Sequence, residues 1–318
     1  MRITIISLDL YGYDGYIVKE LEERGYVVNH FNIDKNKYQY KNVFEKIFNG
    51  FRKVFLGKNY KKDHLNKIIL ENIEKLGHQD KILMIRPDRF YNSTLRTISC
   101  LCDDFVAFHY DGSRKARGII KTFPLFDRIF TFDKEDAKKY NLLFITNFIY
   151  KEYKLKKNHA AFHVSTLDSR VKLLEKIVYI LNSKKLNCDV NIVSLDENYN
   201  PPIGLPINFL NKRIPIEELD ERIKKSSIHI DTQRNIQTGL TFRVFESIGY
   251  RAKLITSNVD VKNYDFYNTN NILVIDEDNI IIPDSFLTSD YEEIPEHIYK
   301  KYTLKNWVDT VFNLSTTN

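Results

Sequence analysis

Short runs of apolar, often β-branched residues recur along this chain and alternate with stretches of helical periodicity. In the first half these runs fall at 2–7, 26–31, 81–85, 105–109, 127–132 and 142–147. The pattern restarts in the second half at 160–164, 189–193, 227–231, 254–257 and 272–275. Buried strands separated by helices are typical of parallel sheets with helices on both faces. We therefore predict an α/β fold of two Rossmann-like, doubly wound domains facing each other across a cleft.

The two series of strands are separated by a charged stretch at 150–158, which looks like a solvated linker. The 318 residues suit two domains of about 150 residues each. We predict an N-terminal Rossmann-like domain at 1–150 and a C-terminal one at 159–293. A helical segment at 294–318, which contains the only tryptophan, ends the chain.

Composition excludes several other classes of protein. Three cysteines are too few for a disulfide framework or a zinc ribbon, so we expect a protein of the reducing cytoplasm. No apolar run approaches the length of a transmembrane helix. The net charge of +6 suits phosphate-bearing substrates or anionic lipid, but the chain carries no recognisable nucleic-acid-binding module.

The most informative stretch is the loop and helix that follow the predicted strand at 227–231. The free N–H groups and the dipole of a helix beginning near Leu240 favour an anion. Gly239 permits close approach of the backbone to a phosphate. Thr238 and Thr241 add hydroxyl groups, and Arg243 adds a guanidinium in the first turn. We predict a phosphate site here.

Glu246 lies one turn after Arg243 on the same face of this helix. Its carboxylate could accept hydrogen bonds from ribose hydroxyls, as the acidic residue of dinucleotide-binding folds does. The alternative is that Arg243 and Glu246 form an ordinary ion pair on the surface of a capped helix. The spacing alone leaves both interpretations open.

Segment 237–249 (QTGLTFRVFESIG), together with 253–258 and 264–267, resembles the GT-B-fold bacterial glycosyltransferases of lipopolysaccharide and capsular polysaccharide synthesis. These belong to the group-1 glycosyltransferase superfamily. Other segments are similar to the same proteins in the same order: 85–88, 109–113, 126–140 and 294–307. The resemblance implies transfer of a sugar from a nucleotide-activated donor to a growing surface polysaccharide or lipid-linked acceptor.

The resemblance also implies that the C-terminal domain binds the nucleotide sugar. Glu246 matches the second acid of the superfamily's E-x7-E motif, whereas Thr238 stands where the first acid would be.

Four further polar residues fit such a donor site. They are Ser165 and Thr166, expected to cap a helix and contact phosphate, and Gln233 and Gln237, expected to donate to sugar hydroxyls.

In such an arrangement the N-terminal domain would hold the acceptor. Tyr11 and Tyr13 offer aromatic faces for pyranose rings, and Asp14 offers a carboxylate, although it could simply cap a helix. Asp111 is our first candidate for the general base, with His109 and Asp14 as the other catalytic candidates. The alternatives are an ordinary turn at 111–112 and a structural imidazole at His109.

Arg86 and Asp88 are the remaining candidates for acceptor binding. Arg86 could bind an acceptor phosphate or carboxylate through two hydrogen bonds, or could pair with Asp88.

Two acidic residues near the end of the chain, Asp276 and Asp278, match the metal-binding Asp-x-Asp pattern of the GT-A glycosyltransferase fold. They follow the predicted phosphate helix, which is the wrong place in the chain for that fold. We interpret them as a solvated turn, and we expect no cofactor and no essential metal beyond the nucleotide-sugar co-substrate.

The segment 41–62 is basic and amphipathic, with seven Lys or Arg residues against one acid. It could lie peripherally on the inner face of an anionic cytoplasmic membrane, beside a lipid-linked acceptor. Alternatively, it is a helix that packs its apolar face into the core and exposes a basic face.

Other functions remain possible on this pattern. A related enzyme could transfer another phosphate-activated group, such as Kdo from CMP-Kdo or glycerol phosphate. A more remote alternative is a basic nucleic-acid-binding protein, which would bind with strong salt dependence; we expect no nucleic-acid partner.

Overall fold

The computed structural model describes residues 1–9, 11–35, 38–114, 116–154, 158–194, 204–234 and 239–314. Gln237 and Thr238 of the predicted donor site therefore lie outside the described residues. Contacts divide the chain into unit 1, residues 1–145 and 308–318, and unit 2, residues 146–307. For comparison, the domains predicted from the sequence end at 150 and begin again at 159.

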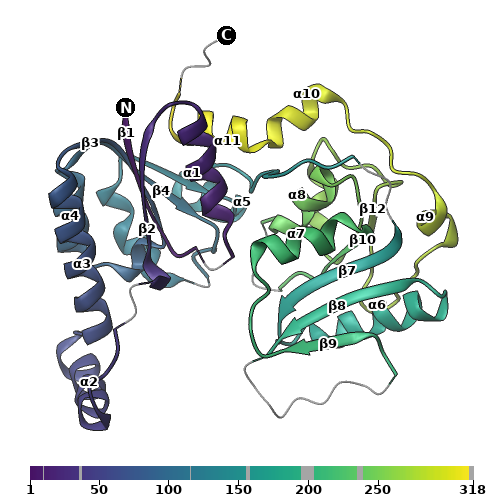
Figure 1. Cartoon of the computed structure of the whole chain (residues 1–318), viewed down its shortest axis with the longest axis horizontal. Helices are drawn as coiled ribbons and strands as arrows, with labels where there is room; N and C mark the ends of the chain where they lie inside the picture. The colour runs from purple at the N-terminus through teal and green to yellow at the C-terminus, as the bar shows by residue number, and fades with distance from the viewer. Residues whose placement is uncertain are drawn as a thin grey trace. The chain divides into compact units, whose positions relative to one another are not determined.

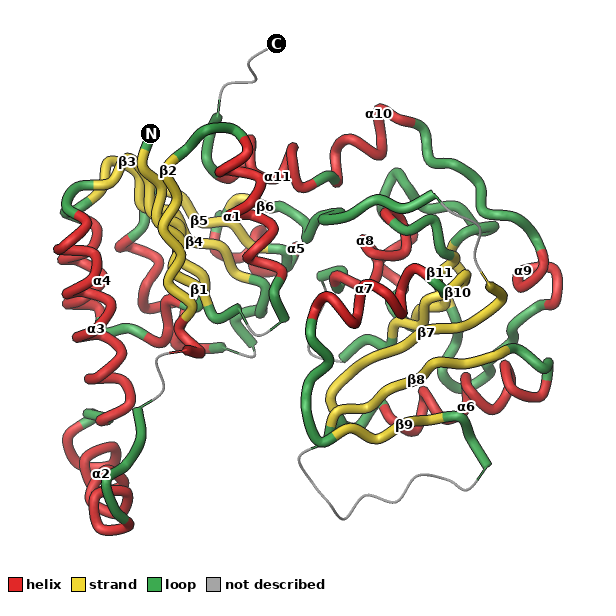
Figure 2. Tube along the Cα trace, in the orientation of Figure 1, coloured by secondary structure: helices red, strands yellow, loops and turns green. Residues whose placement is uncertain are grey.

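The described part of unit 1 contains a six-stranded parallel sheet with the order β2-β1-β3-β4-β5-β6. Ile3, Ile5 and Ile6 of β1 are fully buried because helices cover both faces of the sheet (Figures 1 and 2). The strands are β1 (Arg2–Ser7), β2 (Val27–Asn32), β3 (Gln79–Ile85), β4 (Cys102–His109), β5 (Arg128–Thr131) and β6 (Leu143–Phe144).

The helices of unit 1 follow the strands in the alternation that the sequence predicts. They are α1 (Tyr13–Glu23), α2 (Val43–Leu56), α3 (Tyr60–Leu76), α4 (Asn92–Ser99) and α5 (Lys134–Tyr140), with 3-10 turns η1 (Ile33–Lys35), η2 (Pro87–Arg89) and η3 (Arg117–Leu125). Ile69 and Ile73 of α3 pack with Leu95 of α4 on Ile82 and Met84 of β3, which makes one core. Helix α2 contributes no side chain to that core, and its only buried residue is Asn49.

The described part of unit 2 contains a second six-stranded parallel sheet, with the order β12-β11-β10-β7-β8-β9. Its strands are β7 (Asn158–Thr166), β8 (Asn187–Val193), β9 (Ile207–Leu210), β10 (Ser226–Asp231), β11 (Lys253–Thr256) and β12 (Ile272–Val274). The sequence missed β9, a four-residue strand.

The helices of unit 2 pack on this sheet in two groups. They are α6 (Val171–Ser183), α7 (Ile216–Lys224), α8 (Phe242–Gly249), α9 (Asp284–Thr288) and α10 (Glu296–Tyr299), with 3-10 turns η4 (Val259–Asn263) and η5 (Lys300–Tyr302). The last helix, α11 (Leu304–Val311), begins in unit 2 and ends in unit 1. Leu174 and Ile177 of α6 pack on Val190 of β8, and Val244 and Phe245 of α8 belong to a second cluster.

The predicted linker is only partly solvated where the structure describes it: Glu152 and Lys154 are exposed. Tyr150 is buried, and the Lys151 ammonium lies 2.6 Å from a carboxylate oxygen of Asp220. A Cβ on Gly249 would come within 2.3 Å of the Lys151 carbonyl oxygen, so only glycine fits under this segment. Lys151 thus pairs with α7, and its backbone packs against Gly249 of α8, which composition alone could not show.

Each sheet has one point where the strand order reverses direction. In unit 1 it lies between β1 and β3, and in unit 2 between β7 and β10. Crevices at the carboxyl ends of the strands beside such a point are where ligands bind in open α/β sheets. The residues that follow these four strands are therefore the candidates for ligand binding.

Among the described residues, no helix is both long enough and apolar enough to cross a bilayer.

Candidate functional site

Two arginines converge at the reversal point of the unit 2 sheet. Arg170 follows β7, and its guanidinium makes two hydrogen bonds of 2.8 Å to the two carboxylate oxygens of Asp168. Arg234 follows β10 and donates to the same carboxylate at 3.1 Å and to Thr166 Oγ1 at 3.3 Å. Arg170 also donates to the Thr232 carbonyl at 2.7 Å. The loops after β7 and β10 are thereby joined through one carboxylate.

The net charge of this cluster is positive, because two guanidiniums share Asp168. Burial raises the pKa of Asp168, but the hydrogen bonds from Arg170 outweigh it, and the pKa falls to about 2. The side chains of Arg170 and Arg234 remain 17% and 33% exposed, so both stay accessible to an anion. Neither arginine was predicted from the sequence. Their positions, four and three residues after the strands that flank the reversal point, are the signal that could have found them.

Two polar atoms beside this cluster are buried and have no hydrogen-bond partner among the described residues. They are Oγ1 of Thr232, just after β10, and Nδ2 of Asn258, just after β11. A buried polar group without a partner costs about 1–3 kcal/mol. A ligand bound at these strand ends could supply the missing partners.

The predicted phosphate helix is α8, and its start is well capped. Thr241 is the N-cap residue; its Oγ1 accepts from the Arg243 backbone N–H at 3.2 Å and donates to Asp231 Oδ1 at 2.9 Å. Gly239 is buried just before the helix. Gln233 is half-buried, and its backbone N–H donates to Ser257 Oγ at 3.0 Å.

Arg243 and Glu246 form an ion pair, but an interior one. Arg243 is 9% exposed and lies over the Phe162 ring at 4.8 Å, and Glu246 is 1% exposed. The Tyr150 hydroxyl donates to Glu246 Oε1 at 2.8 Å. A surface pair is therefore excluded. The Glu246 carboxylate already interacts with Arg243 and with the Tyr150 hydroxyl. It could therefore contact a ribose only by giving up one of these partners.

The expectation that 165–168 caps a helix is wrong. Ser165 and Thr166 belong to β7 itself, and α6 begins only at Val171, with no side-chain hydrogen bond at its N-cap. The Ser165 hydroxyl lies 2.9 Å from Nε2 of His163. The strand continues further than the apolar pattern indicated because polar residues at a strand's carboxyl end can still pair with the neighbouring strand.

In unit 1, Arg86 joins two of the predicted acceptor residues. Its guanidinium makes hydrogen bonds of 2.9 and 2.8 Å to the Asp88 carboxylate and one of 3.2 Å to Asp111 Oδ2. Burial raises the pKa of Asp88, but these hydrogen bonds outweigh it and the pKa is lowered. Arg86 has a left-handed φ of 69°, a backbone conformation that costs free energy for a non-glycine residue and is frequent at functional sites.

His109 ends β4 and is 3% exposed. Neither ring nitrogen has a hydrogen-bond partner among the described residues, and the ring centroid lies 5.8 Å from that of Phe123. Burial lowers the pKa of His109 to about 4, so the imidazole is neutral at physiological pH. The ring is therefore a weak proton acceptor.

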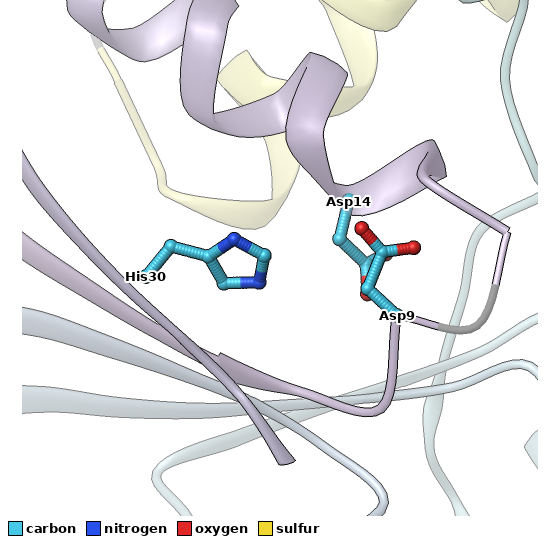
Figure 3. Close-up of side chains that lie close together, drawn as sticks. All are labelled: Asp9, Asp14 and His30. Atoms are coloured by element: carbon cyan, nitrogen blue, oxygen red, sulfur yellow. The ribbon is translucent and has the colours of Figure 1, made fainter. Parts of the chain in front are cut away.

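Asp14, in the first turn of α1, lies close to Asp9 in the loop after β1 and to His30 in β2 (Figure 3). The Tyr110 hydroxyl lies 3.1 Å from both carboxylate oxygens of Asp14, which is 1% exposed. Burial, and next the charge of Asp9, raise the pKa of Asp14 from 3.8 to about 7. A carboxylate with such a pKa is a competent general base near neutrality.

Asp9, Asp14 and His30 could also hold a divalent cation, since their ligand atoms lie within 4.8 Å of one another. Protein groups already account for each of them: Gly12 N–H donates to Asp9 Oδ1 at 2.7 Å, and His30 Nε2 lies 2.9 Å from Ser7 Oγ. The Asp276–Asp278 pair is an exposed turn in which Asp276 accepts from the Asp278 backbone N–H at 2.9 Å.

Two aromatic rings stand in the loop between β1 and α1. Tyr11 is 47% exposed, and the ring centroids of Tyr11 and Tyr13 are 6.3 Å apart. Gly12, with a φ of 86°, turns the chain between them into α1. Their role in binding a sugar ring stays a prediction.

No protein-family model matches the chain, and no curated protein matches its sequence. Solved structures do match its fold. An α,α-trehalose-phosphate synthase (UDP-forming) from Burkholderia vietnamiensis aligns with a TM-score of 0.58 at 9% identity, over 98% of this chain and 96% of that one. The trehalose-6-phosphate synthase OtsA aligns with a TM-score of 0.57 at 11% identity, over 100% of both chains. A UDP-GlcNAc 2-epimerase from Methanocaldococcus jannaschii aligns with a TM-score of 0.50 at 12% identity, over 98% and 100%.

These likenesses show the fold. The two parallel-sheet units have the GT-B architecture predicted from the sequence, and that prediction is confirmed.

Proposed function

We propose that this protein is a glycosyltransferase that uses a nucleotide-activated sugar. The observation that carries the proposal is the convergence of Arg170 and Arg234 at the reversal point of the unit 2 sheet. A GT-B fold supplies a crevice at this point, and two accessible guanidiniums match the charge of a diphosphate. The similar structure named above as a UDP-forming synthase agrees with a nucleotide-sugar donor.

The donor would bind at the carboxyl ends of β7, β10 and β11. Arg170 and Arg234 would meet the diphosphate together with the start of α8, where Arg243 lies. Thr232 and Asn258 would provide hydrogen bonds that nothing among the described residues now takes up. The negative charge that develops on the leaving nucleotide would be stabilised by these fixed cations and by the helix dipole.

The acceptor would bind at the carboxyl ends of β1, β3 and β4 in unit 1. We propose Asp14 as the residue that takes the acceptor's hydroxyl proton, because its pKa is raised to about 7. Asp111, our first candidate from the sequence, accepts a hydrogen bond from Arg86 and is better suited to positioning the acceptor. As the proton leaves, the acceptor oxygen bonds to the sugar's anomeric carbon and the nucleotide departs with the electron pair.

The acceptor is a saccharide or a lipid-linked saccharide of lipopolysaccharide or capsule type, as the sequence resemblance implies. Transfer of Kdo from CMP-Kdo, or of glycerol phosphate, would use the same cationic site. The arginines provide the positive charge that a metal ion supplies in other transferases, so we propose that no metal is essential.

A thermal-shift screen against UDP-, GDP-, dTDP- and CMP-sugars tests the donor. A ligand at 100 times its dissociation constant stabilises the folded protein by about 2.7 kcal/mol. One nucleotide class should raise the melting temperature, and the Arg234→Ala variant should lose that shift. If a stabilising donor is converted to an epimer without release of nucleotide, the protein is an epimerase and not a transferase.

A further inference from the structure

Helix α2 packs its polar side against the protein and exposes its apolar side, which is the reverse of an ordinary amphipathic helix in a water-soluble protein. Its inward side carries the polar residues Glu45, Asn49 and Arg52, which are spaced at helical period. Asn49 is the only residue of α2 that is fully buried, at 1% exposure. The alternative that α2 packs its apolar face into the core is therefore wrong.

Polar contacts hold α2 in this orientation. Asn49 Oδ1 accepts from the Tyr60 backbone N–H at 2.7 Å, and Asn49 Nδ2 donates to the Tyr40 hydroxyl at 2.8 Å. The Arg52 guanidinium lies 3.0 Å from Asp63 Oδ2 and stacks over the Tyr60 ring at 4.0 Å. These bonds leave the opposite face of the helix without a packing partner in the described chain.

That opposite face is apolar and open. Eight large apolar side chains of α2 are more than half exposed: Val43, Phe44, Ile47, Phe48, Phe51, Val54, Phe55 and Leu56, with exposures from 55% to 82%. All but Leu56 fall on one side of the helix, at positions i, i+1, i+4, i+5, i+8, i+11 and i+12. An exposed apolar surface of this size marks an interaction site.

The exposed charges around α2 are basic. Lys46 and Lys53 are exposed on the polar side of the helix, and Lys41, Lys58 and Lys61 are exposed beyond its two ends. The only acid of 41–62, Glu45, accepts hydrogen bonds from the Tyr38 hydroxyl and the Lys41 backbone N–H. Tyr38, Tyr40 and Tyr60 form an aromatic cluster against the same polar side. A helix with phenylalanines on one face and lysines on the other is typical of helices that lie in a membrane interface.

We propose that α2 docks this protein on an anionic lipid bilayer, with Phe44, Phe48, Phe51 and Phe55 inserted among the acyl chains and the lysines at the headgroups. A second copy of the chain is a poorer partner, because a twofold contact through this face would bring together two copies of segment 41–62, which has seven Lys or Arg residues and one acid. Anionic headgroups complement these cations, and the acyl chains complement the apolar face.

The position of α2 in unit 1 connects membrane docking with the proposed binding of the acceptor. The helix lies at the start of α3, away from the strands (Figure 1), and so on the side where the strands' carboxyl ends and the proposed acceptor residues lie. Lys62, just beyond α2, donates to the Asp88 backbone carbonyl at 3.2 Å. A lipid-linked acceptor would therefore reach unit 1 from the surface that α2 contacts. The docking itself does not depend on the proposed glycosyl transfer.

Co-sedimentation with vesicles tests the docking without any activity assay. The full-length protein should bind vesicles of phosphatidylcholine mixed with phosphatidylglycerol, and bind phosphatidylcholine alone much more weakly. Phe44→Ser/Phe55→Ser should reduce binding by about tenfold or more, because two inserted rings are lost. Lys46→Gln/Lys53→Gln should reduce binding to the anionic vesicles by about tenfold and make it less sensitive to salt.

Val259→Ser is the matched control, since Val259 is 65% exposed in unit 2 and should not affect vesicle binding. All of the substituted side chains are exposed, so melting temperatures should stay at the wild-type value. Equal binding by wild type and Phe44→Ser/Phe55→Ser would overturn the proposal. So would a wild-type protein that ignores vesicles but forms a dimer that Phe44→Ser/Phe55→Ser disrupts, because the face would then be an interface between copies.

Discussion

The reversal points of the two sheets have the same architecture and opposite chemistry. In unit 2 the residues after β7 and β10 are arginines that share one carboxylate of lowered pKa. In unit 1 the residues after β1, β3 and β4 are mainly carboxylates: Asp9, Asp14, Asp88 and Asp111, with Arg86 among them. Strand order thus determines where a ligand can bind, and the few side chains that follow each strand determine which ligand. A cationic crevice suits a diphosphate, and an acidic one suits a hydroxyl that must lose a proton.

The largest effect should come from removing the proton acceptor of unit 1. Asp14→Asn keeps an oxygen to accept from Tyr110 but cannot take a proton, so turnover should fall by about 10²–10⁴. Donor affinity should not change, because the proposed donor site lies in unit 2. The measurement is nucleotide release at saturating donor, with melting temperature followed in parallel.

Asp111→Asn is the matched control for that experiment. Its oxygen can still accept from Arg86 but no longer carries a charge, so turnover should fall by only about tenfold, the difference between a charge-assisted and a neutral hydrogen bond. If Asp111→Asn is the more damaging change and Asp14→Asn is active, the base is Asp111, as the sequence first suggested.

The next largest effect, on stability, should come from breaking the buried Arg243–Glu246 ion pair of unit 2. Arg243→Met leaves the Glu246 carboxylate buried without its ion pair and should destabilise the protein by about 3–5 kcal/mol. Arg243→Met/Glu246→Gln removes both charges and should recover most of that stability. Chemical denaturation of the two variants measures this. Donor affinity that recovers together with stability would remove Arg243 from the proposed donor site.

The free energy of unfolding should change with pH by a few kcal/mol because of Asp14 in unit 1. The folded-state pKa of Asp14 is raised from 3.8 to about 7, so its protonated form stabilises the fold below about pH 4, and that stability is lost as the pH rises to 7. The advantage of Asp14→Asn in unfolding free energy should therefore grow over this range. The kcat/KM of the wild type should rise through pH 7, since the base must be ionised. A flat unfolding difference would show that Asp14 titrates normally.

A smaller effect should follow from one donor contact in unit 2. Arg234→Ala removes one of the two guanidiniums on Asp168 and should weaken donor binding by about 1.5–3 kcal/mol, the value of a charge-assisted hydrogen bond. Calorimetry with the stabilising nucleotide sugar measures it. Arg222→Ala, which removes an arginine on α7 that pairs with Asp189 and Glu218, is the control. Equal affinities in both variants would place the donor elsewhere.

The strands were predictable because both faces of a parallel sheet are buried. Ile3, Ile5 and Ile6 read as a continuous apolar run for that reason, and the same holds for Phe105 to Phe108 of β4. The four-residue β9 was missed because its Ile207–Leu210 run is too short to stand out from the loop. Periodicity thus identified the sheets, but not their last edge strand.

The site was less predictable, because its residues meet only after folding. Arg170 and Arg234 are 64 positions apart in the sequence and bind one carboxylate. The orientation of helix α2 could not be predicted from the sequence for the same reason. Its apolar period predicts a face but not its direction, which Asn49 and Arg52 decide through contacts with residues 40, 60 and 63.

The smallest expected effect is that of a chelator, and it tests the difference between the two crevices directly. If the arginines of unit 2 balance the diphosphate, EDTA should change neither donor affinity nor turnover. If turnover instead disappears and Mn²⁺ restores it, two groups of ligands must be separated. His30→Gln would abolish the restoration if the ion binds with Asp9 and Asp14, and would leave it intact if the ion binds Asp276 and Asp278. The first result would make the carboxylates of unit 1 metal ligands and end their assignment as the proton acceptor. The second would move the donor phosphates away from the β7–β10 crevice.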